Sequence, residues 1–341
     1  MNDLKFLRLF VPGILLGVML LPAHPQVLRW DNAATTAGIQ DGSGNWSNAG
    51  ANTNWWNGTK NIAWANGAIA VLGSNLTVAA TITLTNPVIA GGLIFSNAYS
   101  ATSAGQSVPG YTVAGIGPNT NLTLAGNPAS IVLADNISNP QAYVGVSGQS
   151  TLNVSVTAPG GLSVVSSAAN WQSQISFNNA TNNFGGTLEI GTPGTADYNS
   201  ATALQVQFNN SGLNAGQLYG CTNLVVHTNA GVLMRGTSGA YTLNWPKNFT
   251  ISGDGIPASF FCFGAINYAG NNGCVFPANI NLAGDSTVIL TWGNNNAVVT
   301  NTGNITGTGR LRLNQSANRP TTGSRVVLKG TNTYVGATII D

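Results

Sequence analysis

The sequence predicts an all-β protein, a right-handed parallel β-helix or solenoid that follows an N-terminal signal peptide. Two observations carry most of this prediction: short apolar runs alternate with polar residues between turn residues, and the polar positions hold Asn, Thr and Ser rather than charges. A third observation is a short motif that occurs twice along the chain. No segment of helical length shows a 3.6-residue period with capping residues, so we expect almost no helix.

The first 23 residues are typical of a secretory signal peptide. Lys5 and Arg8 form a short basic region, and the apolar run of residues 9–21 follows it. This run is short for a membrane span, which needs about 20 apolar residues. We expect cleavage after Ala23, with Gln26 as the second choice. An uncleaved N-terminal anchor is the alternative.

The rest of the chain alternates with a period of two, as half-buried strands do. Three typical runs place these residues on one predicted face: Leu76, Val78, Ile82 and Leu84; Leu152, Val154 and Val156; Leu204, Val206 and Phe208. Strands at such short intervals fit sandwiches, barrels and solenoids alike.

Length and composition favour the solenoid among these three architectures. More than 300 residues follow Ala23 without a linker, and a solenoid can grow to any length because each coil contacts only its neighbours. Charged residues make up 6% of the chain, against about 25% in ordinary domains. Stacked coils place like side chains about 4.8 Å apart, where charges repel and Asn or Thr can form hydrogen-bonded ladders. We therefore expect residues 27–70 to form a Trp-rich cap and residues 71–341 to form the solenoid, with repeat-like segments at 181–191 and 305–341.

The C-terminal stretches "ITGTGRLRL" and "VVLKGTNTYVGATII" resemble the autotransporter-associated β-strand repeat, also called the passenger-associated transport repeat. That family has a Gly-Thr-Gly turn, two short strands and then Asn-Thr-Tyr-x-Gly-x-Thr-x-Ile. The matching residues are Gly307, Thr308, Gly309, Leu328, Gly330, Asn332, Thr333, Tyr334, Gly336, Thr338 and Ile340. A degenerate copy holds Asn182, Phe184, Gly186 and Ile190, and the Trp-rich opening of the chain is similar to the start of such proteins.

The resemblance implies a bacterial passenger domain, secreted or displayed on the cell surface, that is adhesive or scaffold-like and not an enzyme. It also implies export through an outer-membrane barrel that this chain does not encode. Members commonly carry many repeats and a C-terminal barrel or sorting signal, so we expect a fragment or truncated product; a short form that pairs with a partner at its open edge is the alternative.

The repeat motif predicts specific structural roles within a solenoid. We expect Gly330 and Gly336 to adopt positive φ at corners, and Asn332 to cap a turn or join a ladder. Tyr334 should fill the coil interior or stack on the next coil, as should Phe184 in the degenerate copy, and Ile340 should face the core.

The acidic residues give little sign of catalysis. Glu189 and Asp197 are the closest pair in sequence, and Asp254 and Asp285 could meet only if they lie one coil apart. We interpret the last two as turn residues hydrogen-bonded to backbone. His227 has no partner in the sequence that would make a triad. We therefore expect no catalytic, cofactor-binding or metal-ligating residue; a carbohydrate-active enzyme on a β-helix is the alternative function.

The N-terminal tryptophans are the strongest candidates for a binding role. Trp46, Trp55, Trp56 and Trp64 cluster within 20 residues, with Trp30 nearby. Exposed rings could stack on sugars, which makes a sugar-binding module a further alternative. We favour a cap, since the first coil of a solenoid needs its open end covered by large side chains.

The cysteines and the scattered charges complete the predictions. Cys262 and Cys274 could form a disulfide in an oxidising compartment and leave Cys221 alone, or all three thiols could be buried. The Lys and Arg residues form no stripe, so we expect no nucleic-acid partner. We expect contacts with polysaccharide or surface proteins, and no stable membrane span once the signal is removed.

Overall fold

The computed structural model describes residues 25–340 with internal gaps. The residues outside the description are 1–24, 75, 101–108, 135, 139–148, 168–172, 180, 195–202, 211–217, 237–240, 243–245, 254, 256–263, 270–272, 285, 293–297, 314–324 and 341. The predicted signal peptide therefore lies outside the described residues. All regular secondary structure in the described part consists of β-strands. No helix in this part is long and apolar enough to cross a membrane.

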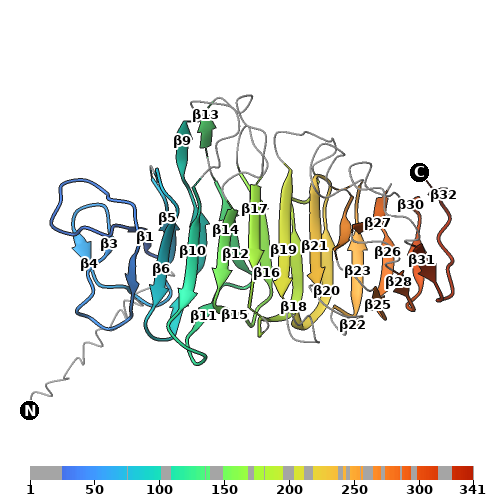
Figure 1. Ribbon diagram of the computed structural model, residues 1–341, viewed down its shortest axis with the longest axis horizontal. Coiled ribbons are helices and arrows are strands. Elements are labelled where there is room, and N and C mark those ends of the chain that lie inside the picture. Colours follow the sequence, from blue (N-terminus) through green and yellow to red (C-terminus); the bar gives the residue numbers. More distant parts are fainter. Residues whose placement is uncertain are drawn as a thin grey trace, which may run out of the picture.

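The strands form two large sheets and two small ones that run along an elongated molecule (Figure 1). The first sheet contains, in spatial order, β29 (Ile305–Gly307), β26 (Asn279–Leu282), β23 (Asn248–Ile251), β20 (Tyr219–Val226), β18 (Asn183–Ile190), β16 (Leu162–Ser166), β12 (Ala129–Leu133), β8 (Gly92–Phe95), β5 (Ile69–Leu72), β1 (Val27–Trp30), β3 (Trp55–Trp56) and β4 (Asn61–Ile62). A branch of three strands joins this sheet at β18. It contains β15 (Ser155–Ala158), which pairs with β18, then β11 (Asn121–Leu124) and β7 (Val88–Ala90).

The second sheet covers another side of the same stack. It contains, in spatial order, β2 (Gly44–Trp46), β6 (Ala80–Leu84), β10 (Tyr111–Gly115), β14 (Gln149–Asn153), β17 (Ser173–Phe177), β19 (Leu204–Asn210), β21 (Ala230–Gly236), β24 (Ile266–Ala269), β27 (Ser286–Trp292), β30 (Leu311–Leu313) and β32 (Thr338–Ile340). One small sheet contains, in spatial order, β22 (Tyr241–Thr242), β25 (Cys274–Phe276), β28 (Val298–Asn301) and β31 (Arg325–Leu328). The other small sheet is the pair β9 (Ala98–Ser100) and β13 (Asn136–Ser138).

The chain visits these sheets in a repeating order, so that each strand pairs with its counterpart one coil later. One coil runs β6–β7–β8, the next β10–β11–β12 and the next β14–β15–β16, and every pairing between these coils is parallel. Among the described pairings only β1–β3 and β3–β4, at the N-terminal end, are antiparallel. The protein is thus all-β with parallel sheets, an arrangement compatible with the predicted β-solenoid.

Alternating side chains fill the interior of the stack. The inward residues of two typical runs are buried, as their period of two predicted: Leu152, Val154, Val156, Leu204, Val206 and Phe208. The prediction for Val78 was wrong, because Val78 is 73% exposed while Leu76, Ile82 and Leu84 are buried. Val78 lies in the connection before β6, where the strand alternation has not yet begun.

Glycines allow the coils to stack closely at their corners. The prediction of positive φ at Gly330 and Gly336 was wrong, since neither belongs to the positive-φ residues, whereas Gly307 has a φ of 111°. A Cβ on Gly330 would lie 2.0 Å from the carbonyl oxygen of Gly303, and one on Gly336 would lie 2.2 Å from that of Gly309. These two positions therefore need glycine because the backbone of the preceding coil is too close for a side chain.

The side chain of Ile340 is more exposed than the sequence predicted. Ile340 pairs with Leu313 in the inward column of the second sheet, yet its side chain is 79% exposed. The expectation that Ile340 faces the core was wrong, because no described residue covers its side chain. Tyr334 is half-buried against the core, and its counterpart Phe184 is fully buried.

Candidate functional site

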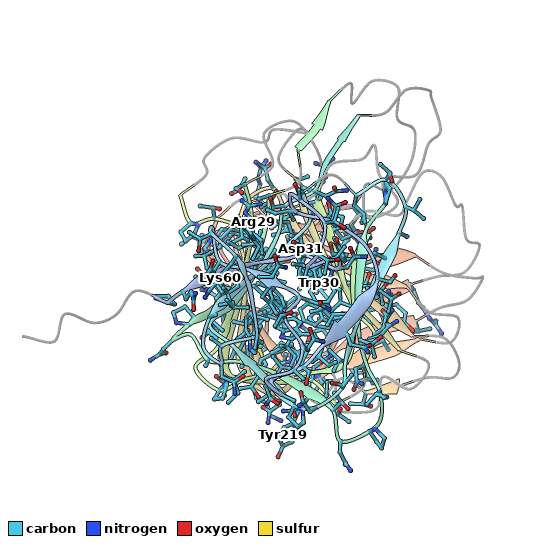
Figure 2. All side chains as sticks on the ribbon, turned by 90° about the vertical axis from the view of Figure 1, so that its left-hand side faces the viewer. Arg29, Trp30, Asp31, Lys60 and Tyr219 are labelled. Atoms are coloured by element: carbon cyan, nitrogen blue, oxygen red, sulfur yellow. The ribbon has the colours of Figure 1, made fainter. Side chains whose placement is uncertain are left out.

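The N-terminal tryptophans pack into one aromatic cluster at the end of the stack, and this end, with Trp30 labelled, faces the viewer in Figure 2. The Trp55 ring lies 5.4 Å from Trp30, 4.8 Å from Trp46 and 4.5 Å from Trp64, between ring centroids. The antiparallel pairing of β1 with β3 brings Trp30 opposite Trp55. Such edge and tilted contacts add about 1 kcal/mol each beyond area burial.

This packing leaves three of the four predicted platform residues without an open ring face. Trp46 and Trp55 are fully buried, and Trp64 is 5% exposed. A sugar cannot stack on these rings in this structure, because other indoles already occupy their faces. Trp56 alone among the four is half-buried.

Two aspartates tie the N-terminal loop to the stack. Asp31 is 1% exposed and accepts hydrogen bonds from the backbone of Ala33 and Gln40. Asp41 accepts one from the Tyr111 hydroxyl at 2.7 Å and one from the backbone N–H of Ser74 at 2.9 Å. Burial, followed by the hydrogen bond to Asp41 and its charge, raises the pKa of Tyr111 above its usual value. These carboxylates are occupied by protein donors and have a structural role.

Glu189 and His227 form a contact that the sequence analysis missed. His227 Nε2 lies 2.7 Å from Glu189 Oε1, and the side chains are 15% and 32% exposed respectively. Glu189 is on β18 and His227 follows β20, and these strands are neighbours in the first sheet. The 38-residue separation hides the contact in the sequence. No local sequence signal could have revealed it, because the contact depends on the length of the coil that separates the two residues.

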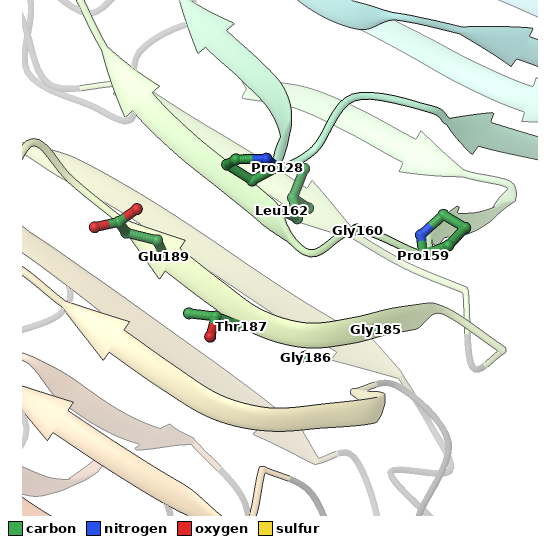
Figure 3. Close-up of a pocket in the computed structure, with 8 residues that line it drawn as sticks. All are labelled: Pro128, Pro159, Gly160, Leu162, Gly185, Gly186, Thr187 and Glu189. Carbon is green, nitrogen blue, oxygen red and sulfur yellow. The ribbon is translucent and has the colours of Figure 1, made fainter.

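An open groove lies beside Glu189 (Figure 3). Its volume is about 510 Å³, and it is lined by Pro128, Pro159, Gly160, Leu162, Gly185, Gly186, Thr187 and Glu189. The stacked glycines create the hollow: a Cβ on Gly185 would lie 2.2 Å from the carbonyl oxygen of Pro159, so no side chain can stand there. Glu189 is the one carboxylate in the lining.

The groove and its neighbouring imidazole offer limited chemistry. Glycoside hydrolysis needs two carboxyl groups on opposite sides of the scissile bond, and the lining supplies one. Within the described residues, no group of three His, Cys, Asp or Glu side chains could hold a metal ion. Asp197, Asp254 and Asp285 lie outside the described residues.

Cys221 and Cys274 are both buried in the interior. Burial, opposed in part by backbone hydrogen bonds, raises the pKa of Cys221 to about 11. The Cys221 thiol donates a 3.3 Å hydrogen bond to the carbonyl oxygen of Asn223. Cys262 lies outside the described residues, and so does its predicted disulfide with Cys274.

The repeat motif places its polar side chain where two coils meet. Asn332 Oδ1 accepts a 3.1 Å hydrogen bond from the backbone N–H of Ile305. Gly307, Gly309, Gly330 and Gly336 lie at the corners of the last coils, and a Cβ on any of them would come within 2.3 Å of the backbone of the preceding coil. The motif residues thus serve coil stacking, and no ionisable side chain other than the Tyr334 phenol lies among them.

Comparison with protein-family models, with curated proteins and with solved structures gave no match. The resemblance to the autotransporter-associated repeat therefore depends on the motif residues alone.

Proposed function

We propose that the chain is a secreted or cell-surface structural protein: a right-handed β-solenoid that acts as an adhesive or scaffold-like passenger and performs no catalysis. The observation that carries the proposal is the parallel stack itself. Counterpart strands follow one another from β5 to β29 in the first sheet and from β2 to β32 in the second. A shape of this kind extends by adding coils and presents its outer faces for contact.

Physical properties of the stack suit an extracellular stalk. Most strands are hydrogen-bonded on both sides by other coils, which leaves few extended segments for a protease to bind. Low charge avoids repulsion between stacked like residues. The interior is filled by apolar side chains from Leu28 to Leu311, which leaves the outer faces as the surfaces that meet partners.

The secreted character is supported by sequence features. Residues 1–23 have the three-part composition of a signal peptide, and the segment 305–341 resembles the repeat of exported passengers. Export through an outer-membrane barrel suits a solenoid, because coils can fold one at a time as they emerge.

The test is to locate and characterise the mature chain in its producing cell. We expect antibodies against the folded protein to label intact cells and mass spectrometry to find an N-terminus at His24 or Val27. We also expect resistance to protease under conditions that degrade an unfolded control. Retention of the full-length chain inside the cell would contradict the proposal.

A further inference from the structure

The groove beside Glu189 crosses three successive coils at one corner of the stack (Figure 3). Pro128 immediately precedes β12, Pro159 immediately follows β15, and Thr187 and Glu189 lie on β18. The strands β12, β16 and β18 are consecutive neighbours in the first sheet and pair in parallel. The groove therefore runs along the stack, across the backbones of three coils, and its volume of about 510 Å³ is in the range of small-ligand sites.

Stacked glycines keep this corner free of side chains. A Cβ on Gly160 would lie 2.8 Å from the carbonyl oxygen of Gly126, and one on Gly185 would lie 2.2 Å from that of Pro159, so neither position has room for a side chain. Gly186 has a φ of 80°, and a Cβ on it would meet no atom within 4 Å. The floor of the groove is thus bare backbone, and the space in front of Gly186 is open to an incoming group.

The carboxylate of Glu189 stands at this groove with one of its two oxygens uncommitted. Oε1 lies 2.7 Å from His227 Nε2, whereas Oε2 has no hydrogen-bond partner among the described residues. The Glu189 side chain is 32% exposed, so Oε2 can be reached from the groove. The contact with His227 holds the carboxylate in place before any ligand arrives, which lowers the entropic cost of binding.

The coils that form the groove supply no cation to balance this carboxylate. The sequence contains no Lys or Arg between Lys60 and Arg235, a span that includes every groove residue. His227 forms the one ion pair of Glu189 among the described residues, and a neutral imidazole can donate that hydrogen bond. The groove therefore carries one unbalanced negative charge whenever the imidazole is neutral, which is complementary to a cationic ligand.

We propose that the groove binds a lysine side chain of a partner protein, with the ammonium group on Glu189 Oε2 and the aliphatic stem against the exposed rings of Pro128 and Pro159. An ammonium group needs one acceptor oxygen, whereas a guanidinium group matches both oxygens of a carboxylate, and His227 already holds one of them. A sugar fits less well, because Thr187 carries the one side-chain hydroxyl in the lining. The inference rests on the proposed function, since the partner is met outside the cell.

The test compares three variants of the full mature chain. Glu189→Gln removes the negative charge but keeps the side-chain size and an acceptor oxygen for His227. His227→Gln is the matched control, because it removes the imidazole and leaves the carboxylate in the groove. Thr187→Glu adds a second carboxylate, since positions 187 and 189 share the outward face of β18 on either side of the buried Leu188. Urea unfolding shows which variants keep the native fold.

Binding is measured by fluorescence anisotropy at pH 8, where an ordinary imidazole is neutral. The probes are coumarin-labelled pentapeptides, blocked at both ends, that carry a central Lys, Arg or norleucine between glycines. We expect the native chain to bind the Lys peptide about tenfold more tightly than the norleucine peptide, and more tightly than the Arg peptide. Glu189→Gln should bind the Lys peptide about tenfold more weakly, as the loss of one charged hydrogen bond implies.

The other two variants separate ligand binding from a structural role of the pair. His227→Gln should bind the Lys peptide within about twofold of the native chain or more tightly, and Thr187→Glu should bind it more tightly. Equal binding of the norleucine peptide, unchanged binding by Glu189→Gln, or an equal loss in His227→Gln would each overturn the inference. If Glu189→Gln fails to fold, Thr187→Glu decides, because unchanged Lys binding by that variant contradicts the inference. A displayed chain that binds no Lys peptide overturns this inference alone, and a chain retained inside the cell overturns the proposed function.

Discussion

The side-chain oxygen of Asn332 accepts a hydrogen bond from the backbone N–H of Ile305, one coil earlier, at 3.1 Å. Asn182 Oδ1 makes the same contact to the backbone N–H of Val156 at 2.9 Å. These two asparagines occupy the same position in the two copies of the repeat motif, 150 residues apart. The motif thus marks a place where a side chain replaces a missing backbone acceptor between coils.

The first prediction concerns Asn182, which is fully buried. Its replacement by Ala leaves the N–H of Val156 buried without an acceptor, which costs about 1–3 kcal/mol. Asn281→Ala is the control, because that side chain is exposed, and we expect it to change stability by less than about 0.5 kcal/mol. Urea unfolding of both variants measures the difference. Equal midpoints would mean that water satisfies the N–H of Val156.

The alternating pattern predicted the strands and the buried face well, because a period of two is set by the backbone geometry of a strand. Leu152 and Val206 are buried as expected. Coil length was not predictable, because connections of varying length join the strands: Ile69 pairs with Gly92, but Gly92 pairs with Ser130. The contact between Glu189 and His227 depends on that length, which is why sequence reasoning left His227 without a partner.

Glycine shows the same limit of local reasoning. The motif led us to expect a positive φ at Gly330 and Gly336, which is a property of each residue's own backbone. Glycine is instead needed there because the backbone of the preceding coil lies too close for a side chain. No single coil contains that information, because the close contact exists only between two stacked coils.

The second prediction tests this close stacking at Gly309. A Cβ there would lie 1.7 Å from the carbonyl oxygen of Gly284, so Gly309→Ala must push two coils apart. We expect a loss of about 2–3 kcal/mol, typical of overpacking. Gly50→Ala is the matched control, because a Cβ at Gly50 has no neighbour within 4 Å. It should leave stability unchanged or raise it by up to about 1 kcal/mol. Thermal unfolding of the pair checks this, and similar losses in both would contradict the stacking argument.

The third prediction compares two adjacent tryptophans. Trp55 is fully buried among Trp30, Trp46 and Trp64, so Trp55→Ala should destabilise the chain by about 3–5 kcal/mol. Trp56 is half-buried on the other side of the same strand, and Trp56→Ala should cost clearly less. Urea unfolding followed by tryptophan fluorescence measures both. If Trp56→Ala were the more damaging change, the cluster around Trp55 would not be what closes this end of the stack.

The fourth prediction follows from the raised pKa of the Cys221 thiol. Alkylating reagents attack the thiolate, and a pKa of about 11 leaves little thiolate at pH 8. We therefore expect iodoacetamide to label Cys221 in the native chain far more slowly than in the urea-unfolded chain. Peptide mass spectrometry identifies the labelled cysteine. Equal labelling rates in the two states would show that the thiol is accessible and ionised in the fold.

The same pKa predicts how stability depends on pH. The unfolded thiol loses its proton near pH 9.0, whereas the folded one keeps it until about pH 11. Below pH 9 both states hold the proton, so this group adds no pH dependence. Between pH 9 and 11 the unfolded state alone ionises, and stability falls by about 3 kcal/mol in total as the pH rises. Cys221→Ala should remove this part of the slope while Cys274→Ala should keep it, which separates the effect of Cys221 from the titration of Tyr and Lys residues in the same pH range.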